Sequence, residues 1–341
     1  MKILQDYDLA KLNTFGISAR AKFLTEVGSL TELEELFTLP EFKQNKKIFL
    51  GSGSNVLFTK DFEGLVILNK LKGIKILKAG AEVGEDFVLV KAMGGEVWHN
   101  LVIFAVDRGY WGIENLSLIP GTVGAAPMQN IGAYGAELAN VLENVESIEI
   151  ATGNKRIFTK EECELGYRDS IFKNKLKNKY FISAITLKLS KKEKKNISYK
   201  ILSDHIEKNK IQIERSKDIS NAVCQIRRSK LPDPKVIGNA GSFFKNVFVE
   251  DAKIKEMLSI YPHMPYFKEN GMTKIPAGWL IEQSGWKGKR IGNVGVHEKQ
   301  ALVIVNHGGA NGAEIKNLAE QIVASVLAKF GLELIPEVNL I

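Results

Sequence analysis

The longest uncharged stretch of the chain runs from residue 115 to residue 136 and is rich in glycine and alanine. Pro120, Pro127 and four glycines interrupt it, so it cannot form a membrane-spanning helix. Backbone with so few side chains allows another group to approach closely. Its N–H groups then offer hydrogen bonds to an anion such as a pyrophosphate, in place of cationic side chains. A closely packed loop that binds nothing is the alternative.

The composition of the 341-residue chain is that of an ordinary globular protein, with 45% hydrophobic and 25% charged residues. This length predicts more than one domain. The first residues lack the continuous apolar core of a signal peptide. Cys163 and Cys224 have no CxxC spacing and no histidines in ligand register, so we expect neither a metal site nor a disulfide. These features favour a cytoplasmic protein without a membrane partner, and we expect a monomer.

The formal net charge is +8, and ten of the lysines lie between Lys173 and Lys200. A basic cluster of this kind either binds phosphates nonspecifically or forms the solvated face of a strand pair and the loop after it. The chain has no nucleic-acid-binding motif, ordered aromatic platform or recognition-helix pattern. We therefore expect no nucleic-acid partner.

Short apolar strands alternate with helices in the first part of the chain. Ser29 is placed to cap a helix over residues 29–37, and Gly109 to end an amphipathic helix over residues 96–109. Residues 147–159 predict a hairpin with Gly153 and Asn154 in its turn. The expected strands are residues 21–27, 47–50 and 64–68.

The clearest predicted element is a helix between Asn311 and Gly331. Its apolar residues recur at helical spacing, Asn311 is placed to cap its start with Glu314 three residues on, and Gly331 is placed to end it. We expect a final strand over residues 332–341. From about Ile201 the pattern changes to longer polar helices, which predicts a domain boundary there.

A second small-residue segment, GSGSN at residues 51–55, lies between two apolar runs. Its backbone N–H groups are able to converge on one anion, although many strand-to-strand turns share this pattern. The chain has neither G-x-G-x-x-G after a strand nor G-x-x-x-x-G-K-[ST]. A dinucleotide would therefore bind through an architecture other than a Rossmann fold or a P-loop.

Six segments of the chain, in this order, are similar to those of the UDP-N-acetylenolpyruvoylglucosamine reductase family. The resemblance covers nearly the whole chain from Asn13 onward. The segments are NTFGI (13–17), GSGSNVLF (51–58), IPGTVGAAPMQNIGAYGAE (119–137), CELGYRDSIFK (163–173), KLPDPKVIGNAGSFFKN (230–246) and the terminal PEV (336–338).

The resemblance implies an α+β protein with an FAD-binding fold of the vanillyl-alcohol-oxidase type and a third, substrate-binding α+β domain. We expect residues 1–70 with 331–341 to form FAD-binding subdomain 1, residues 71–200 subdomain 2, and residues 201–330 the substrate-binding domain. The implied reaction starts with NADPH, which reduces non-covalently bound FAD. The flavin then reduces UDP-N-acetylglucosamine enolpyruvate to UDP-N-acetylmuramate, a peptidoglycan precursor.

The resemblance also implies three catalytic residues. Hydride adds to the methylene carbon of the enolpyruvyl group, so negative charge develops at the adjacent carbon and the carboxylate. Arg168 would hold the carboxylate with its forked guanidinium, and Glu337 would donate a hydrogen bond to the developing enolate, its pKa raised in an apolar run. Ser242, in a glycine-rich bend before two phenylalanines, would protonate the carbanion. The alternatives are an ion pair of Arg168 with Asp169, an exposed Glu337 on an edge strand and a structural turn at Ser242.

The remaining expected site residues line the cofactor and the substrate. The FAD residues are Gly51, Ser52, Gly53, Ser54, Asn55, Pro120, Gly121, Thr122, Val123, Gly124, Gly132, Ala133 and Tyr134. The substrate residues are Tyr167, Tyr199, Arg227, Lys230, Asn246 and Gln300. Tyr199 marks the subtype of the family with a substrate-covering loop, and the lysines around it would attract an anionic nucleotide.

Two other functions remain as alternatives. An FAD-linked oxidase of the same fold would pass electrons to oxygen, but no histidine is placed in a flavin loop for covalent attachment. A basic binding protein without catalysis would not need Arg168, Ser242 and Glu337 together.

Overall fold

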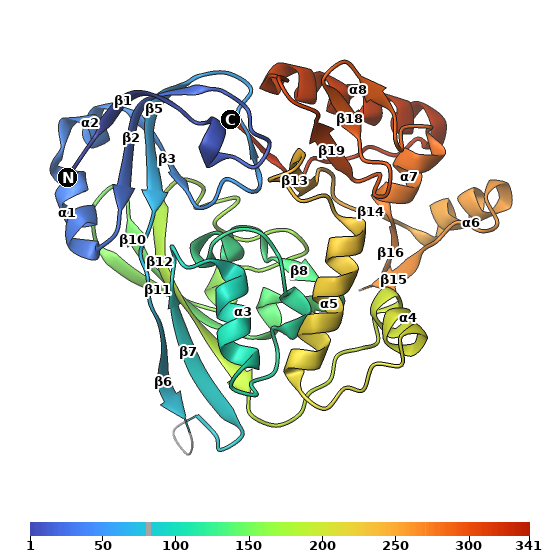
Figure 1. The fold of residues 1–341 in the computed structure, drawn as a ribbon, viewed down its shortest axis with the longest axis horizontal. Helices are drawn as coiled ribbons and strands as arrows, with labels where there is room; N and C mark the ends of the chain where they lie inside the picture. The colour runs from blue at the N-terminus through green and yellow to red at the C-terminus, as the bar shows by residue number, and fades with distance from the viewer. Residues whose placement is uncertain (80–82, 270) are drawn as a thin grey trace. The chain divides into compact units, whose positions relative to one another are not determined.

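The computed structural model describes residues 1–79, 83–269 and 271–341. The chain forms two compact units, each assembled from several segments (Figure 1). Unit 1 contains Met1–Tyr7, Ala21–Ser52 and Glu63–Ser229, and unit 2 contains Asp8–Arg20, Gly53–Phe62 and Lys230–Ile341. One of the crossings between the units therefore falls inside the GSGSN segment, between Ser52 and Gly53.

Unit 1 contains a four-stranded sheet in the order β1-β2-β5-β3, against which α1 and α2 pack. The helix predicted after Ser29 is confirmed, because the Ser29 hydroxyl accepts a hydrogen bond of 3.1 Å from the amide of Glu32. Leu33 and Leu36 are buried on the inner side of this helix. The bounds are β1 (Leu4–Asp8), β2 (Arg20–Val27), β3 (Lys46–Leu50), β5 (Phe62–Asn69), α1 (Leu30–Thr38) and α2 (Pro40–Gln44).

A second sheet of unit 1 has five antiparallel strands in the order β11-β10-β12-β7-β6 (Figure 1). The central strand of this sheet, β12, is buried along most of its length, which explains the nearly continuous run of apolar residues in this strand. The predicted hairpin is confirmed, with Gly153 in the turn at φ +76°. The bounds are β6 (Ile74–Ala79), β7 (Phe87–Met93), β10 (Leu142–Glu149), β11 (Lys155–Thr159) and β12 (Tyr180–Ser190), with a short pair β8 (Gly132–Ala133) and β9 (Ala136–Glu137).

Three helices complete unit 1: α3 (Trp98–Val106), α4 (Lys200–Lys208) and α5 (Ser216–Lys230). The helix expected over residues 96–109 is shorter at both ends: Val97 before it pairs with Thr122 in a bridge, and the chain turns at Gly109, whose φ is +73°. The apolar sides of α4 and α5 pack around Trp111. Both helices thus belong to unit 1, whereas the sequence assigns residues 201–230 to a third domain. The division into three domains stays a prediction.

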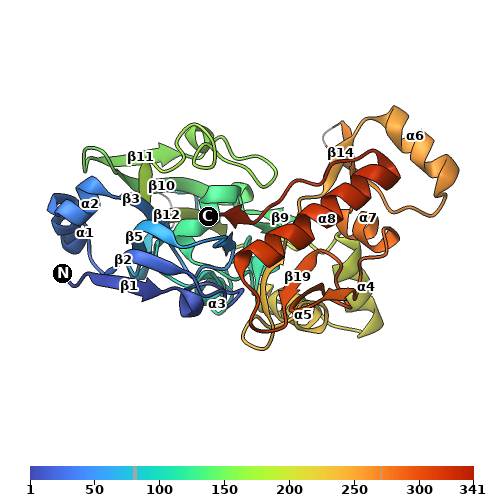
Figure 2. The same cartoon turned by 90° about the horizontal axis from the view of Figure 1, so that it is seen from above.

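Unit 2 contains a four-stranded sheet, β13-β19-β18-β17, and a three-stranded sheet, β14-β16-β15. The predicted helix after Asn311 is confirmed: the side chains of Asn311 and Glu314 cap its start reciprocally, and Gly331 ends it at φ +65°. This helix, α8, lies against β18 and β19 (Figure 2). The bounds are β13 (Gly238–Ser242), β14 (Val247–Val249), β15 (Phe267–Glu269), β16 (Met272–Ile275), β17 (Arg290–Ile291), β18 (Val294–Val296), β19 (Val303–Asn306), α6 (Asp251–Ile260), α7 (Ala277–Gln283) and α8 (Gly312–Phe330).

The final strand expected over residues 332–341 is wrong in its extent. Only β20 (Asn339–Leu340) is a strand, and it pairs in parallel with β4 (Val56–Leu57). The preceding residues are held by burial of Leu332, Leu334 and Val338 and by one isolated antiparallel bridge, in which Pro336 lies opposite Phe244. Pro336 has no N–H group and adds no hydrogen bond of its own at this bridge, and the pairing does not extend into a regular strand.

Candidate active site

The GSGSN segment turns between β3 and β4, and its two glycines are required by close contacts. A Cβ on Gly51 would lie 2.3 Å from Oγ1 of Thr122, and a Cβ on Gly53 would lie 2.0 Å from the carbonyl oxygen of Leu12. Gly53 also has φ +64°, and its carbonyl accepts a hydrogen bond from the amide of Thr14 at 3.1 Å. Only glycine fits at either position without displacing its neighbours.

The same turn has hydrogen-bond donors that the protein does not use. Within the part of the chain that the structure describes, the amides of Ser52, Gly53 and Ser54 and the hydroxyls of both serines make no hydrogen bond to protein. Several small residues with uncommitted donors form the kind of backbone concavity that binds anions. This turn therefore fits one phosphate-bearing part of a dinucleotide.

The second segment expected to bind FAD, residues 120–124, is held by backbone contacts to the chain before α3. The amide of Val123 donates to Glu96 at 2.8 Å, and the amide of Gly124 donates to Gly94 at 2.8 Å. A Cβ on Gly124 would lie 3.1 Å from the Cα of Gly94. After Thr122 the chain enters a 3-10 helix, Val123–Gln129, so the expected open loop is in part helical. The glycine at position 124 therefore serves close packing as well as access for a ligand.

His99 and Leu118 were not among the expected site residues, and they are hydrogen-bonded to each other immediately before residues 120–124. Leu118 has φ +56°, a left-handed conformation that is unfavourable for a leucine. Its amide donates a hydrogen bond of 3.1 Å to Nδ1 of His99 on α3. Burial, with Arg228 and Arg227 nearby, lowers the pKa of His99 and so favours the neutral ring that this bond requires. No local sequence pattern indicates this pairing, because it joins a helix to a loop.

Arg168 lies at the tip of a tight turn in which the backbones of Gly166 and Asp169 exchange hydrogen bonds. Its φ of +50° places it in the left-handed region, at a cost of ~1 kcal/mol or more. The guanidinium donates a hydrogen bond of 2.6 Å to the carbonyl of Gly132 and lies over the ring of Tyr167 at 5.2 Å. The Asp169 carboxylate accepts hydrogen bonds from Asn174. The turn thus directs Arg168 to the segment that starts at Gly132.

Two tyrosines and an arginine lie next to that segment. The rings of Tyr134 and Tyr199 meet edge to face, with centroids 5.6 Å apart and planes at 79°. Burial raises the pKa of both phenols, opposed by the charge of Arg227 at Tyr134 and of Arg168 at Tyr199. Burial lowers the pKa of Arg227, a half-buried residue of α5, and the neighbouring Tyr134 opposes this shift. Two cationic side chains therefore border this aromatic pair.

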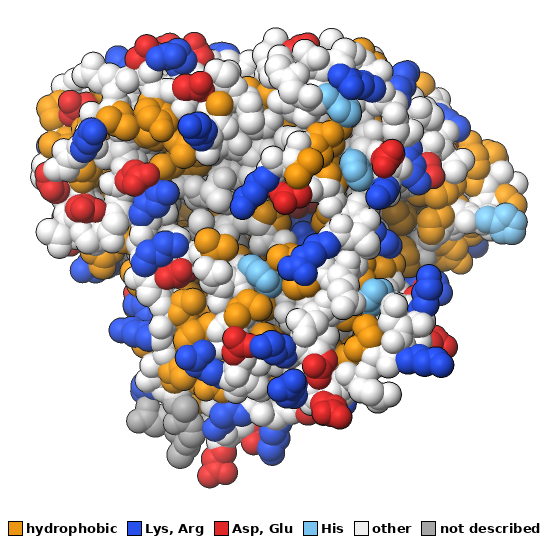
Figure 3. Space-filling model, in the orientation of Figure 1, with side chains coloured by type: hydrophobic (Ala, Val, Ile, Leu, Met, Phe, Trp, Pro, Cys, Tyr) orange, Lys and Arg blue, Asp and Glu red, His pale blue; other side chains and the backbone are white. Residues whose placement is uncertain are grey.

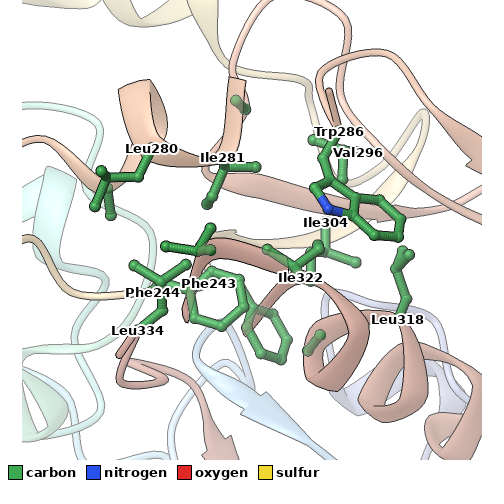
Figure 4. Packing of buried hydrophobic residues seen from close by; sticks show 14 of the residues in the cluster. Phe243, Phe244, Leu280, Ile281, Trp286, Val296, Ile304, Leu318, Ile322 and Leu334 are labelled. Carbon is green, nitrogen blue, oxygen red and sulfur yellow. The ribbon is translucent and has the colours of Figure 1, made fainter. Parts of the chain in front are cut away.

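In unit 2, Ser242 ends β13 and is followed by two buried rings. Phe243 and Phe244 are 1% and 2% exposed and pack among the side chains in Figure 4, as expected for anchors of the bend. Gly241 has φ +70°, so the chain changes direction immediately before the serine. Within the described residues, the Ser242 hydroxyl makes no hydrogen bond to protein. It is a half-buried hydroxyl on a firmly held backbone.

Glu337 lies beside this bend. Its amide donates a hydrogen bond of 2.8 Å to the carbonyl of Phe243. Its carbonyl accepts one of 3.3 Å from the side chain of Asn55, in the GSGSN segment. The residue is half-buried rather than fully exposed on an edge. Unit 2 therefore brings together Ser242, Glu337 and the second half of the GSGSN segment.

The remaining substrate candidates lie around α7 and at the end of α5. The Asn246 side chain accepts a hydrogen bond of 3.0 Å from the amide of Ala277, and the Gln300 side-chain oxygen would lie 3.3 Å from a Cβ on Gly278. Both side chains thus border the start of α7. Lys230 is exposed at the end of α5.

The two units divide the expected site residues. Unit 1 contains Gly51, Ser52, the residues of 120–124 and 132–134, Tyr167, Arg168, Tyr199 and Arg227. Unit 2 contains Gly53, Ser54, Asn55, Lys230, Ser242, Asn246, Gln300 and Glu337.

Several lysines of the lysine-rich segment are paired with acidic residues. Lys175, Lys192 and Lys200 form ion pairs with Glu164, Asp86 and Asp204. Figure 3 shows Lys and Arg side chains interspersed with Asp and Glu over one face of the molecule. This distribution is that of a solvated surface, on which single ion pairs contribute little stability.

No helix among residues 1–79, 83–269 and 271–341 is both long and apolar enough to cross a membrane. The same residues contain no group of three histidine, cysteine, aspartate or glutamate side chains placed to hold a metal ion.

Comparison with known proteins identifies the class first. Residues 21–159 match a family model described as an FAD binding domain, and residues 233–341 match the C-terminal domain of UDP-N-acetylenolpyruvoylglucosamine reductase. Together with the uncommitted donors of the GSGSN segment, these matches define an FAD-binding oxidoreductase with a second, C-terminal domain, as the sequence predicts.

Whole-chain comparisons identify the family. The chain is 45% identical to UDP-N-acetylenolpyruvoylglucosamine reductase of Flavobacterium johnsoniae and 47% identical to that of Amoebophilus asiaticus, over 100% of each chain in both cases. A crystal structure of the enzyme from Thermus caldophilus has the same fold, with a TM-score of 0.64 at 23% identity, over 99% of this chain and 98% of that one. The chain belongs to the UDP-N-acetylenolpyruvoylglucosamine reductase family.

Proposed function

We propose that the protein uses FAD and NADPH to reduce UDP-N-acetylglucosamine enolpyruvate to UDP-N-acetylmuramate, with Arg168, Ser242 and Glu337 as its catalytic residues. The similarity of the whole chain to curated reductases carries the assignment of the activity. Bound FAD supplies the hydride chemistry, because it accepts a hydride from NADPH and transfers one to the enolpyruvyl group. A monomer in the cytoplasm, where these nucleotides are available, is part of the proposal.

Arg168 is the proposed cation for the substrate carboxylate. Its guanidinium is already oriented by the carbonyl of Gly132 and by the ring of Tyr167, so little side-chain freedom is lost when a carboxylate binds. A fixed positive charge beside the carboxylate stabilises the negative charge that develops on it during hydride addition.

Ser242 and Glu337 are the proposed proton donor and hydrogen-bond donor. The Ser242 hydroxyl is uncommitted within the described protein, so it is available to a carbanion, which is basic enough to take its proton. Glu337, as a neutral acid, would donate to the developing enolate from the neighbouring segment. The backbone bond between Glu337 and Phe243 supports a joint role, because it holds the two segments side by side.

The nucleotide part of the substrate is proposed to bind Tyr199, Arg227, Lys230, Asn246 and Gln300, with Tyr167 beside Arg168. Tyr199 and Arg227 both lie next to Tyr134, so they contribute to one face. Asn246 and Gln300 both border α7. The cationic and amide groups in this set suit a phosphate-bearing, hydroxyl-rich ligand.

The visible spectrum of the purified protein tests the function directly. We expect a flavin spectrum that NADPH bleaches under anaerobic conditions and that the enolpyruvyl sugar nucleotide then restores. In air, NADPH alone should lead to little oxygen consumption. A colourless protein, or rapid oxygen consumption without the sugar nucleotide, would contradict the proposed reaction.

A further inference from the structure

Asn115 joins two segments that are far apart in the sequence. Its side chain is 1% exposed, and Nδ2 donates hydrogen bonds of 2.8 Å to the carbonyls of both Tyr134 and Asn196. The Asn196 side chain in turn donates a bond of 3.0 Å to the carbonyl of Gly135. Three hydrogen bonds therefore hold the chain before Tyr199 against the segment that contains Tyr134.

The backbone at this junction is unusual, which explains why side-chain amides are needed. Tyr134 and Gly135 are both left-handed, at φ +48° and +79°. This conformation directs their carbonyls away from regular backbone partners and towards Asn115 and Asn196. The strain at Tyr134 persists only where its surroundings hold it, and Asn115 is one such constraint.

The hydrogen bonds of Asn115 and Asn196 determine where Tyr199 lies. This tyrosine immediately precedes α4, three residues after Asn196, and its ring meets that of Tyr134. Ile197, between them, packs against the buried cluster that contains Trp111, and so does Tyr134. The hydrogen bond from the Asn115 side chain to the Asn196 carbonyl and the ring contact thus fix the Tyr199 segment at two points. Gly132, in the same segment as Tyr134, accepts the hydrogen bond of Arg168.

We propose that Asn115 is a positioning residue that holds the Tyr199 segment on the Gly132–Gly135 segment, so that Tyr199 is ready for the sugar nucleotide. This inference rests on the proposed function, in which Tyr199 contacts the substrate. Asn115 itself does not touch the reacting atoms. With both Nδ2 hydrogens committed to carbonyls, it acts by ordering Tyr199 before the substrate binds, which lowers the entropic cost of binding.

The test uses Asn115→Asp in the FAD-bound enzyme. Aspartate has the same shape but no donor, and its charge would face two carbonyl oxygens. We expect the KM for the sugar nucleotide to rise roughly tenfold or more, with reduction of bound FAD by NADPH within about twofold of wild type. Hydrogen exchange of the amides in residues 195–203 should become faster. Ser147→Ala is the control, because it removes another buried hydrogen bond of unit 1, to Arg156, and should leave KM unchanged.

A double-mutant cycle separates positioning from general stability. If Asn115 acts through Tyr199, Asn115→Asp should raise KM far less in a Tyr199→Ala background than in wild type. An undiminished effect in that background would overturn the inference, and so would unchanged exchange in residues 195–203. Asn196→Ala removes only the bond to Gly135 and should raise KM in the same direction by a smaller factor. It serves as the test if Asn115→Asp does not fold, and an unchanged KM would then overturn the inference.

The substrate contact proposed for Tyr199 is tested separately, by the single variant of the double-mutant cycle. Tyr199→Ala alone should raise KM, and an unchanged KM would reject the substrate contact assigned to Tyr199. In that case the exchange of residues 195–203 in Asn115→Asp decides whether Asn115 holds this segment.

Discussion

The amide of Glu337 donates a hydrogen bond of 2.8 Å to the carbonyl of Phe243, the residue that follows Ser242. The amide of Lys245 donates to Ile335 at 2.9 Å, so the two segments are joined twice. Phe243 is buried in the core of unit 2 (Figure 4). The backbones that carry the proposed proton donor and the proposed acid therefore form one fixed frame, in which small changes of side-chain length should have large effects.

Replacement of Ser242 by alanine should separate the two half-reactions. We expect FAD binding and its reduction by NADPH to be nearly intact, because no proton donor to the substrate is needed there. Reoxidation of the flavin by the enolpyruvyl substrate should slow by ~10²–10⁴-fold, the usual effect of losing a proton donor. Stopped-flow absorbance measures both rates, with Ser259→Ala on exposed α6 as the control. Equal slowing of both half-reactions would mean that Ser242 is structural.

The contribution of Glu337 to kcat should depend on the position of its side chain more than on its acidity. Glu337→Gln keeps a neutral hydrogen-bond donor at the same length, whereas Glu337→Asp keeps the acid but withdraws it by one methylene. Because the backbone at Glu337 is tied to Phe243, it cannot readily move to compensate. We therefore expect the Gln variant to retain more kcat than the Asp variant. A Gln variant much weaker than the Asp variant would show that the residue must ionise or transfer a proton.

Gly51→Ala should weaken FAD binding for a steric reason. The added Cβ would lie 2.3 Å from Oγ1 of Thr122, so the GSGSN segment and residues 120–124 would have to separate. We expect the Kd for FAD to rise by about tenfold or more, since a misplaced donor set loses hydrogen bonds. Fluorescence titration of FAD into the apoprotein measures this change. Gly109→Ala is the matched control, because its Cβ would have no neighbour within 4 Å and only its φ of +73° opposes the substitution. Equal FAD affinity in the two variants would exclude the steric argument.

His99 should make stability depend on pH. Its pKa is lowered in the folded protein, so above the ordinary histidine value of ~6.5 both folded and unfolded states are neutral at this residue. As the pH falls below that value, the unfolded chain binds the proton first and the free energy of unfolding decreases. The decrease ends once the pH has passed the lowered folded-state pKa.

His99→Gln should remove this contribution. His297 and His307 also have pKa values lowered by burial, so they contribute to both proteins, and only the difference between wild type and variant reports His99. Urea denaturation at several pH values between about 7 and 5 measures it. Identical pH dependence in the two proteins would show that His99 has the same pKa in both states.

Local signals in the sequence determined where helices and turns begin and end when a single residue sets that end. The Asn311 cap, the Gly331 stop, the Ser29 cap and the turn at Gly153 all formed as predicted. These features depend on the backbone conformation that one residue type allows, so they do not need a tertiary partner. The ordered motifs of the reductase family likewise determined the fold class and the family, because their residue types and their order are properties of the chain itself.

The arrangement of the site was decided only by the tertiary structure. Asn115 meets Asn196, and Glu337 meets Phe243, across separations of 81 and, from the residue numbers, 94 positions. No local pattern encodes such pairs, because their hydrogen bonds exist only after distant segments have packed together. The same holds for residues 332–338, where the apolar sequence predicted a strand. Instead, burial of Leu334 and Val338 in the core and one isolated bridge between Pro336 and Phe244 place Glu337 beside Phe243.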